Sequence, residues 1–206
     1  MARSINAGKC ELCGEGVPRA EMSRHLEACA PAHDTRGKPG ELVLLLFEAA
    51  GDPRYWILVE ARADAGLKQV DDLLRDVWLE CCGHMSGFYV GREELDMRSK
   101  VGDVLRSKSL KLRHEYDFGS TTTLDGRVFG TRKGSIGRAP VRLLARNDPP
   151  PWTCEKCKKP ATIVCPFCSN AAVFCDAHAS SHPHAKEGVY LPVVNSPRMG
   201  VCGYTG

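Results

Sequence analysis

The sequence predicts an α+β fold in which a central domain of one main helix on a largely antiparallel sheet is flanked by two small zinc-binding modules. Short apolar runs separated by turn residues indicate the strands of this sheet. One stretch with helical periodicity indicates the helix. Most of the eleven cysteines gather near the two ends of the chain. The chain has 206 residues, 43% hydrophobic and 26% charged, which excludes a disordered or collagen-like protein.

Two segments without apolar periodicity divide the chain. Residues 31–40 carry prolines and glycines, and residues 148–151 end in three consecutive prolines, which favour an extended spacer. We therefore predict five parts: a Cys-Cys-His-Cys finger (1–30), a linker (31–40), an α+β domain (41–147), a Pro-rich linker (148–151) and a two-zinc module with a C-terminal tail (152–206).

The central domain has one amphipathic helix and six short strands. Leu67, Val70, Leu74 and Trp78 recur at three- and four-residue steps, and Cys81 continues this apolar stripe, so we expect Cys81 to be packed against a core. His114 is expected at the surface. The strands are predicted at 42–48, 55–60, 85–90, 110–118, 121–128 and 141–145, with a helical turn at 101–105.

The N-terminal segment carries four residues with the spacing of zinc ligands. Cys10 and Cys13 form a knuckle, and His25 and Cys29 lie four apart on a predicted helix at 20–29, so both project from one helix face. In a reducing compartment this pattern is typical of zinc rather than of disulfides. Zinc would supply the stability that a unit of this size cannot obtain from its core.

The finger resembles the small ubiquitin-binding finger of DNA-repair proteins over about 20 residues. The similarity lies in Cys10-Glu11-Leu12-Cys13-Gly14 and His25-Leu26-Glu27-Ala28-Cys29. The resemblance implies that Leu26 and Glu27 contact a protein partner. Glu27 stands where that family has aspartate, and Ala30 where it has leucine. The alternative is a structural or general protein-binding knuckle.

The C-terminal module offers eight ligands in four sequential pairs. Two zinc ions need eight ligands, and in plan the segment resembles B-box, RING and MYND modules, in which the pairs interleave. The resemblance implies one site of Cys154, Cys157, Cys175 and His178, and another of Cys165, Cys168, His182 and His184. A simple ribbon that uses only the first four cysteines is the alternative. With the finger, we expect about three zinc ions, all structural because four protein ligands leave no place for a reactive water.

The charges of the central domain are unevenly distributed. Residues 41–97 have 12 acidic and 5 basic side chains, whereas residues 98–146 have 12 basic and 4 acidic ones. A basic, glycine-bearing segment can lie along phosphates. The candidate nucleic-acid contacts are Arg127, Arg132, Lys133, Arg138 and Arg142. The alternatives are a solvated hairpin tip, or pairing with the acidic helix face of the same domain.

The central domain resembles the Ri-plasmid open-reading-frame-three-like family, also called the insertion-element passenger or TnpR-like family, over about 105 residues. The resemblance rests on the ordered segments 55–59, 73–78, 82–88 and 116–119, of which Tyr116-Asp117-Phe118-Gly119 is the most specific. Ser120, Thr121 and Thr122 replace the Asp, Trp and His that many members have next. Residues 191–204 resemble the tail of zinc-bearing members. The resemblance implies no biochemical activity.

These patterns predict a non-enzymatic zinc-binding adaptor with a protein partner and no small-molecule substrate. The phosphate-binding loop, His-Glu-x-x-His and Gly-x-Ser-x-Gly motifs are absent. A nucleic-acid-binding protein that uses residues 98–146 is one alternative. A thiol or metal-dependent enzyme is another, and it would need an open zinc position or an activated Cys82 near His84 and Asp117.

The sequence predicts a cytoplasmic protein that does not enter a membrane. The longest apolar run, 42–47, has six residues, whereas a membrane-spanning helix needs about 20. Residues 1–6 lack the apolar region of an export signal. Cys202 and Tyr204 are expected to pack the tail back onto the C-terminal zinc module.

Overall fold

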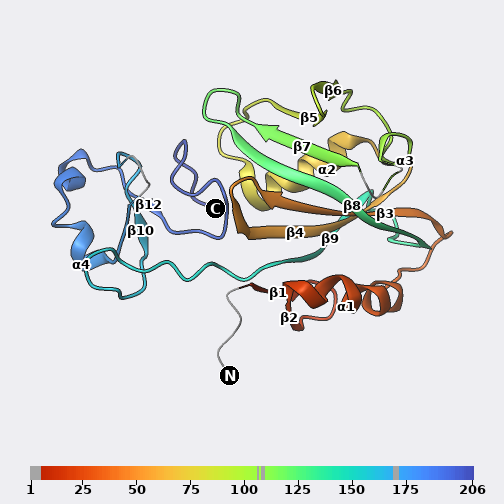
Figure 1. The fold of residues 1–206 in the computed structure, drawn as a ribbon, viewed down its shortest axis with the longest axis horizontal. Helices are drawn as coiled ribbons and strands as arrows, with labels where there is room; N and C mark the ends of the chain where they lie inside the picture. Colours follow the sequence, from red (N-terminus) through yellow and green to blue (C-terminus); the bar gives the residue numbers. More distant parts are fainter. Residues whose placement is uncertain (1–5, 106, 108–109, 169–171) are drawn as a thin grey trace.

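A nine-stranded sheet forms the centre of the protein, and it includes strands from the predicted finger (Figure 1). The computed structural model describes residues 6–105, 107, 110–168 and 172–206, so most of the segment examined for an export signal lies outside the described residues. All the strand pairs described are antiparallel, in the order β2-β1-β9-β4-β3-β8-β7-β5-β6. The predicted α+β class is confirmed.

The predicted strands all occur, with shifted ends, and three further strands of this sheet were not predicted (β1, β2 and β6). The sheet contains β1 (Ala7–Cys10), β2 (Gly16–Pro18), β3 (Gly40–Ala49), β4 (Asp52–Arg62), β5 (Ser86–Val90), β6 (Glu93–Leu95), β7 (Lys111–Tyr116), β8 (Thr122–Gly134) and β9 (Val141–Asn147).

Strands β3 and β4 are buried on both faces because their side chains alternate between two cores. In β3, Leu45 and Phe47 belong to one core, and Leu44 and Leu46 belong to the other. The same alternation in β4 places Trp56 with Leu44 and Leu46. These near-continuous apolar runs therefore form the middle layer of a three-layer domain.

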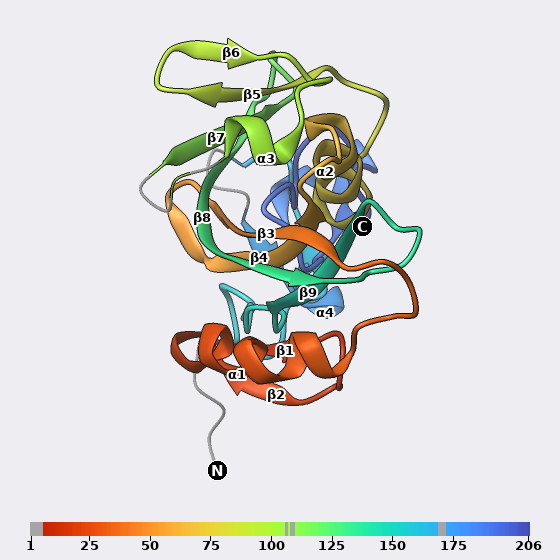
Figure 2. The same ribbon diagram turned by 90° about the vertical axis from the view of Figure 1, so that its right-hand side faces the viewer.

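Helices cover the two faces of the sheet. The predicted main helix is α2 (Leu67–Leu74), which continues as a π-helical turn, η1 (Arg75–Leu79), and ends at Glu80, before the predicted end. Helix α1 (Arg19–Ala32) is longer than predicted and lies on the opposite face from α2 (Figure 2). The expected turn after residue 100 is α3 (Val101–Val104).

A buried polar pair joins α2 to the sheet. The Nε2 atom of His114 lies 2.8 Å from Oδ1 of Asp71, and both side chains are almost fully buried. The expectation that His114 is a surface residue is wrong, because its place on β7 directs the ring toward α2. Burial raises the pKa of Asp71, but hydrogen bonds from His114 and Ser86 outweigh that effect and lower it.

The C-terminal module has only short elements. Its three-stranded sheet has the order β11-β10-β12. The elements are β10 (Ile163–Val164), β11 (Val173–Phe174), α4 (Asp176–Ala179), the 3₁₀-helix η2 (Pro183–Glu187) and β12 (Leu191–Pro192). Among the described residues, no helix has the length and apolar character needed to cross a membrane.

Candidate metal centres

In the part of the chain that the structure describes, four groups of cysteine and histidine side chains bring four ligand atoms each within 4.8 Å of one another. We name them the finger cluster (Cys10, Cys13, His25, Cys29), the first C-terminal cluster (Cys154, Cys157, Cys175, His178), the second C-terminal cluster (Cys165, Cys168, His182, His184) and the tail cluster (Cys81, Cys82, His84, Cys202). Tetrahedral zinc, with bonds of about 2.3 Å to sulfur and about 2.0 Å to nitrogen, separates two sulfurs by about 3.8 Å and sulfur from nitrogen by about 3.5 Å.

The finger cluster has these separations. The Sγ atoms of Cys10 and Cys29 are 3.8 Å apart, and Sγ of Cys13 lies 3.4 Å from Nε2 of His25. The other ring nitrogen of His25 faces Glu15, 3.7 Å away, which would orient the ring for binding through Nε2. The knuckle turns at Gly14, whose φ of 81° suits glycine.

The two C-terminal clusters bring together the residues that the cross-braced resemblance implies. In the first, Nδ1 of His178 lies 3.5 Å from Sγ of Cys154 and 3.4 Å from that of Cys175. In the second, Sγ of Cys168 lies 3.3 Å from Nε2 of His182 and 3.6 Å from Nδ1 of His184. In a simple ribbon these histidines would be free. Here they lie at the clusters, beside the cysteine sulfurs.

Backbone geometry favours a thiolate at Cys154. Burial raises the pKa of this thiol, but hydrogen bonds from the backbone N–H groups of Cys175, Lys156 and Cys157 lower it to about 6. At Cys29, by contrast, burial and the neighbouring thiols Cys13 and Cys10 raise the pKa to about 12. Without a cation the finger therefore retains thiol protons, which a bound zinc ion would displace.

The tail cluster was not predicted, so the number of clusters is four rather than three. Cys81 packs against the main core as expected, but the helix ends before it and its sulfur lies 3.7 Å from that of Cys82. The sulfur of Cys202, from the far end of the chain, lies 3.6 Å from that of Cys82. The Cys82-x-His84 pair is the local signal that could have indicated this cluster.

The C-terminal tail (residues 195–206) packs on the central domain, contrary to expectation, although its Met199 also packs against the small core of the C-terminal module. The Ser196 hydroxyl donates to the carbonyl oxygen of Trp78 at 2.6 Å. The Asn195 side chain donates to the carbonyl of Asn147 and accepts from its side-chain amide. Tyr204 is 4% exposed.

Leu26 and Glu27, the candidate protein contacts of the finger, differ in their surroundings. Leu26 is 1% exposed and packs in the core between α1 and the sheet, because β1 pairs with β9 and thereby brings the finger against the central domain. Leu26 is thus a core residue of this domain. Glu27 is exposed on α1.

Two of the basic candidates form internal ion pairs. Arg132 donates to Glu60 at 2.5 Å and to Asp34 at 2.7 Å, and Arg142 donates to Glu60 at 2.8 Å. Glu60 is fully buried, so these guanidinium groups neutralise an interior charge. The bond from Arg132 lowers the pKa of Asp34. Internal pairing therefore accounts for Arg132 and Arg142, but the partners lie on β4 and in residues 31–40 and not on the acidic helix face.

The other basic candidates are free of such pairs. Arg127, Lys133 and Arg138 are exposed, and no ion pair joins them to any described residue. Arg127 and Lys133 lie on β8, and Arg138 follows it.

Comparisons with known proteins identify no family for this chain. The sequence matches no protein family and no curated protein. One similar solved structure is that of a protein of unknown function from Methanosarcina mazei Go1, with 13% sequence identity and a TM-score of 0.42. The similarity covers 51% of this chain and 67% of that one.

Proposed function

We propose that this chain is a non-enzymatic, zinc-stabilised adaptor that binds a protein partner through its C-terminal module in a reducing compartment such as the cytoplasm. The observation that carries the proposal is the closed geometry of the clusters, each of which has four protein ligands. A zinc ion with four protein ligands has no position for an activated water, so its contribution is to hold a surface in shape.

The exposed aromatic ring of Phe167 marks the surface that we assign to the partner. Phe167 lies between the ligands Cys165 and Cys168 and is 52% exposed, with its ring 5.9 Å from that of His184. The second C-terminal cluster therefore fixes the position of this ring. Rigid, exposed aromatic side chains contribute strongly to protein interfaces because they bury large apolar areas at little entropic cost.

We expect Phe167→Ala to abolish partner capture without loss of zinc. Capture by the purified protein, followed by mass spectrometry, should show partners enriched with the wild type and depleted at least about 10-fold with the variant, since an interface aromatic contributes about 2 kcal/mol or more. Met85→Ala is the matched control, because Met85 is an exposed apolar residue outside the module. Equal capture by both variants, or no capture by the zinc-loaded wild type, would contradict the proposal.

Nucleic-acid binding is a second candidate, favoured by the unpaired side chains of Arg127, Lys133 and Arg138. If these three contact phosphates, the logarithm of the association constant should fall with the logarithm of salt concentration with a slope of about −2.7 for a duplex. The triple alanine variant should lose this binding while its stability changes by less than about 0.5 kcal/mol per site. Arg132 is unsuitable for the test because it neutralises Glu60. Absent or salt-insensitive binding would remove this candidate.

A further inference from the structure

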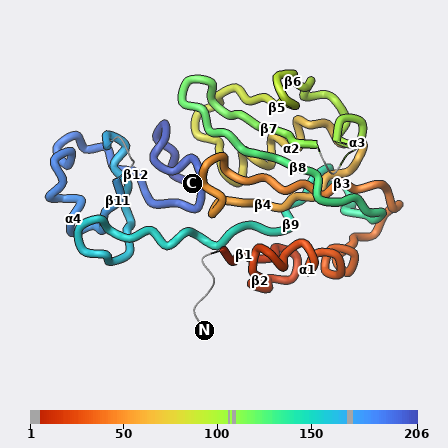
Figure 3. Tube along the Cα trace, in the orientation of Figure 1, coloured from red at the N-terminus to blue at the C-terminus, as the bar shows by residue number. Residues whose placement is uncertain are grey.

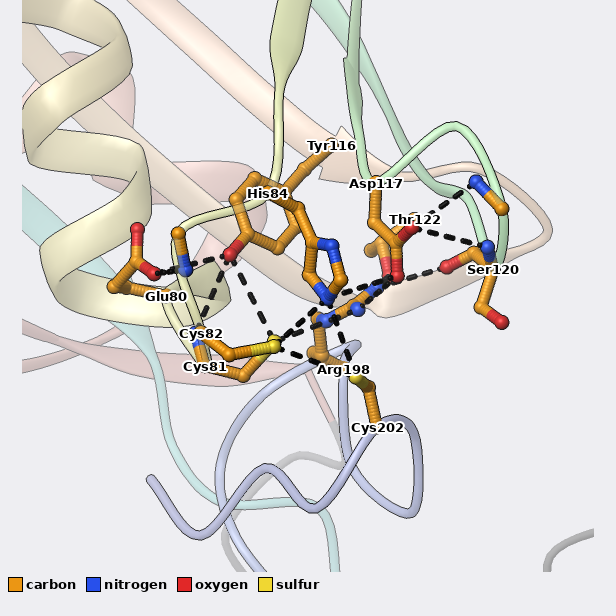
Figure 4. Close-up of polar contacts among 12 residues, drawn as sticks. Glu80, Cys81, Cys82, His84, Tyr116, Asp117, Ser120, Thr122, Arg198 and Cys202 are labelled. Atoms are coloured by element: carbon orange, nitrogen blue, oxygen red, sulfur yellow. Dashed lines mark hydrogen bonds and ion pairs between the residues drawn. The ribbon is translucent and has the colours of Figure 1, made fainter.

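We propose that Cys81, Cys82, His84 and Cys202 form a fourth structural zinc site, which fastens the C-terminal tail to the central domain beside the end of η1. Figure 4 shows the four side chains converging from two segments of the chain. The sulfur separations of 3.7 Å (Cys81 to Cys82) and 3.6 Å (Cys82 to Cys202) match those around tetrahedral zinc. Nε2 of His84 lies 2.9 and 3.2 Å from the sulfurs of Cys82 and Cys202, which is closer than around tetrahedral zinc, and it faces the same centre.

The backbone is shaped so that both segments reach this centre. Gly83 has a φ of 77°, which turns the chain between Cys82 and His84, and its N–H donates to Glu80 at 2.6 Å. On the tail, Cys202 has a φ of 52°, in the left-handed region that side-chain-bearing residues seldom adopt. A cysteine held in this conformation indicates that its thiol has a specific use, which metal coordination supplies.

Charged and polar groups around the cluster suit three thiolates. Three thiolates and one zinc ion have a net charge of −1. The fully buried Arg198 directs Nη2 toward the sulfur of Cys81 at 3.6 Å, and the Tyr116 hydroxyl lies 3.7 Å from the same sulfur. Arg198 therefore donates to a ligand sulfur, and the Tyr116 hydroxyl accepts from the backbone N–H of Cys81, as second-layer groups that orient the ligands of structural metal sites do.

The cysteine inventory supports the assignment independently. The finger and tail clusters contain three cysteines each, and the C-terminal clusters contain three and two, so the four clusters account for all eleven cysteines of the chain. All eleven are free thiols. A soft divalent cation is the ligand that this donor set selects, because thiolate and imidazole favour zinc over magnesium or calcium.

Native mass spectrometry of the intact protein, loaded with zinc and dialysed, tests the proposal. We expect four zinc ions in the wild type and three in both Cys202→Ala and His84→Ala. Two variants are used so that a failure of one to fold does not prevent the test. Thr205→Ala, in the same tail but outside the cluster, should retain four. Cobalt substitution gives a second readout: loss of the tail cluster should reduce the thiolate-to-cobalt absorption by about 3 parts in 11, in proportion to its cysteines.

Three zinc ions in the wild type, with Cys82 and Cys202 free to react with an alkylating reagent or joined as a disulfide, would overturn the proposal. Four zinc ions in both variants would also overturn it. The adaptor proposal does not depend on this result, since it rests on Phe167 and the C-terminal clusters, which neither variant touches.

Discussion

Removal of zinc is expected to unfold the C-terminal module while most of the nine-stranded sheet stays folded. The buried core around its two clusters consists of Cys154, Cys165, Ala172, Phe174 and Ala179, so two of its five residues are metal ligands. Its strands are two residues long. Structural zinc contributes about 10–16 kcal/mol to the folding of such small units, more than this core can replace. The central domain has a large apolar core of its own and lacks this dependence.

Amide hydrogen exchange, measured before and after chelation of the zinc, tests this expectation. The N–H groups of Thr162 and Cys165, which bond to the carbonyls of Phe174 and Ala172, should exchange at the rate of an unfolded chain after zinc removal. Amides of β3 and β4 should remain protected. Cys154→Ser should reproduce the effect of chelation, whereas Lys156→Ser, at an exposed position between two ligands, should not. Retained protection of Thr162 in zinc-free protein would show that the module folds without metal.

Much of the central fold was predictable because its signals are local. The apolar runs of β3 and β4 and the helical stripe of α2 lie within single elements. Strands β1 and β2 could not be predicted, because they are short and β1 joins the sheet by pairing with β9, more than 130 residues further along the chain. That pairing also places Leu26 in one core with Leu44 and Leu46 of β3.

The same distinction separates the predicted clusters from the missed one. The finger and C-terminal ligands lie within short stretches, so their spacing alone indicates zinc. The tail cluster joins Cys82 to Cys202 over 120 residues, and no spacing rule covers such a distance. The ion pairs of Glu60 with Arg132 and Arg142 are also long-range, over 72 and 82 residues, and the basic segment therefore looked more available to phosphates than it is.

Replacement of Arg198 by methionine is expected to release the tail. Arg198 is fully buried and donates to Asp117 at 2.5 Å, to the carbonyl of Ser120 at 2.8 Å and to the Thr122 hydroxyl at 3.0 Å. The hydrogen bond from Arg198 lowers the pKa of Asp117 to about 2, so this carboxylate is charged at neutral pH. Methionine fills a similar volume but leaves that charge without its cation, which strongly destabilises the closed tail.

The exchange rates of the Val201 and Tyr204 amides report tail opening, since they bond to the carbonyls of Arg198 and Val201. We expect Arg198→Met to accelerate both by a factor of ~100, the lower end of what loss of one partner in a buried ion pair causes. Any metal bond to Cys202 breaks when the tail opens, both in the wild type and in Arg198→Met. It therefore does not change the ratio of their exchange rates. Arg138→Met, at an exposed position, is the control and should change neither rate.

A second substitution tests whether the unpaired carboxylate of Asp117 causes the faster exchange. Asp117→Asn in the Arg198→Met background should restore part of the protection, because the uncompensated carboxylate is then absent. The folded-state pKa of Asp117 lies below its unfolded value, so the ion pair stabilises the closed tail fully above pH ~4 and progressively less as the pH falls toward ~2. The difference between wild type and Arg198→Met in the exchange rates of the Val201 and Tyr204 amides should decrease over that pH range. If the difference in exchange rate is unchanged by Asp117→Asn and by pH, Arg198 instead holds the tail through its neutral partners, Ser120 and Thr122.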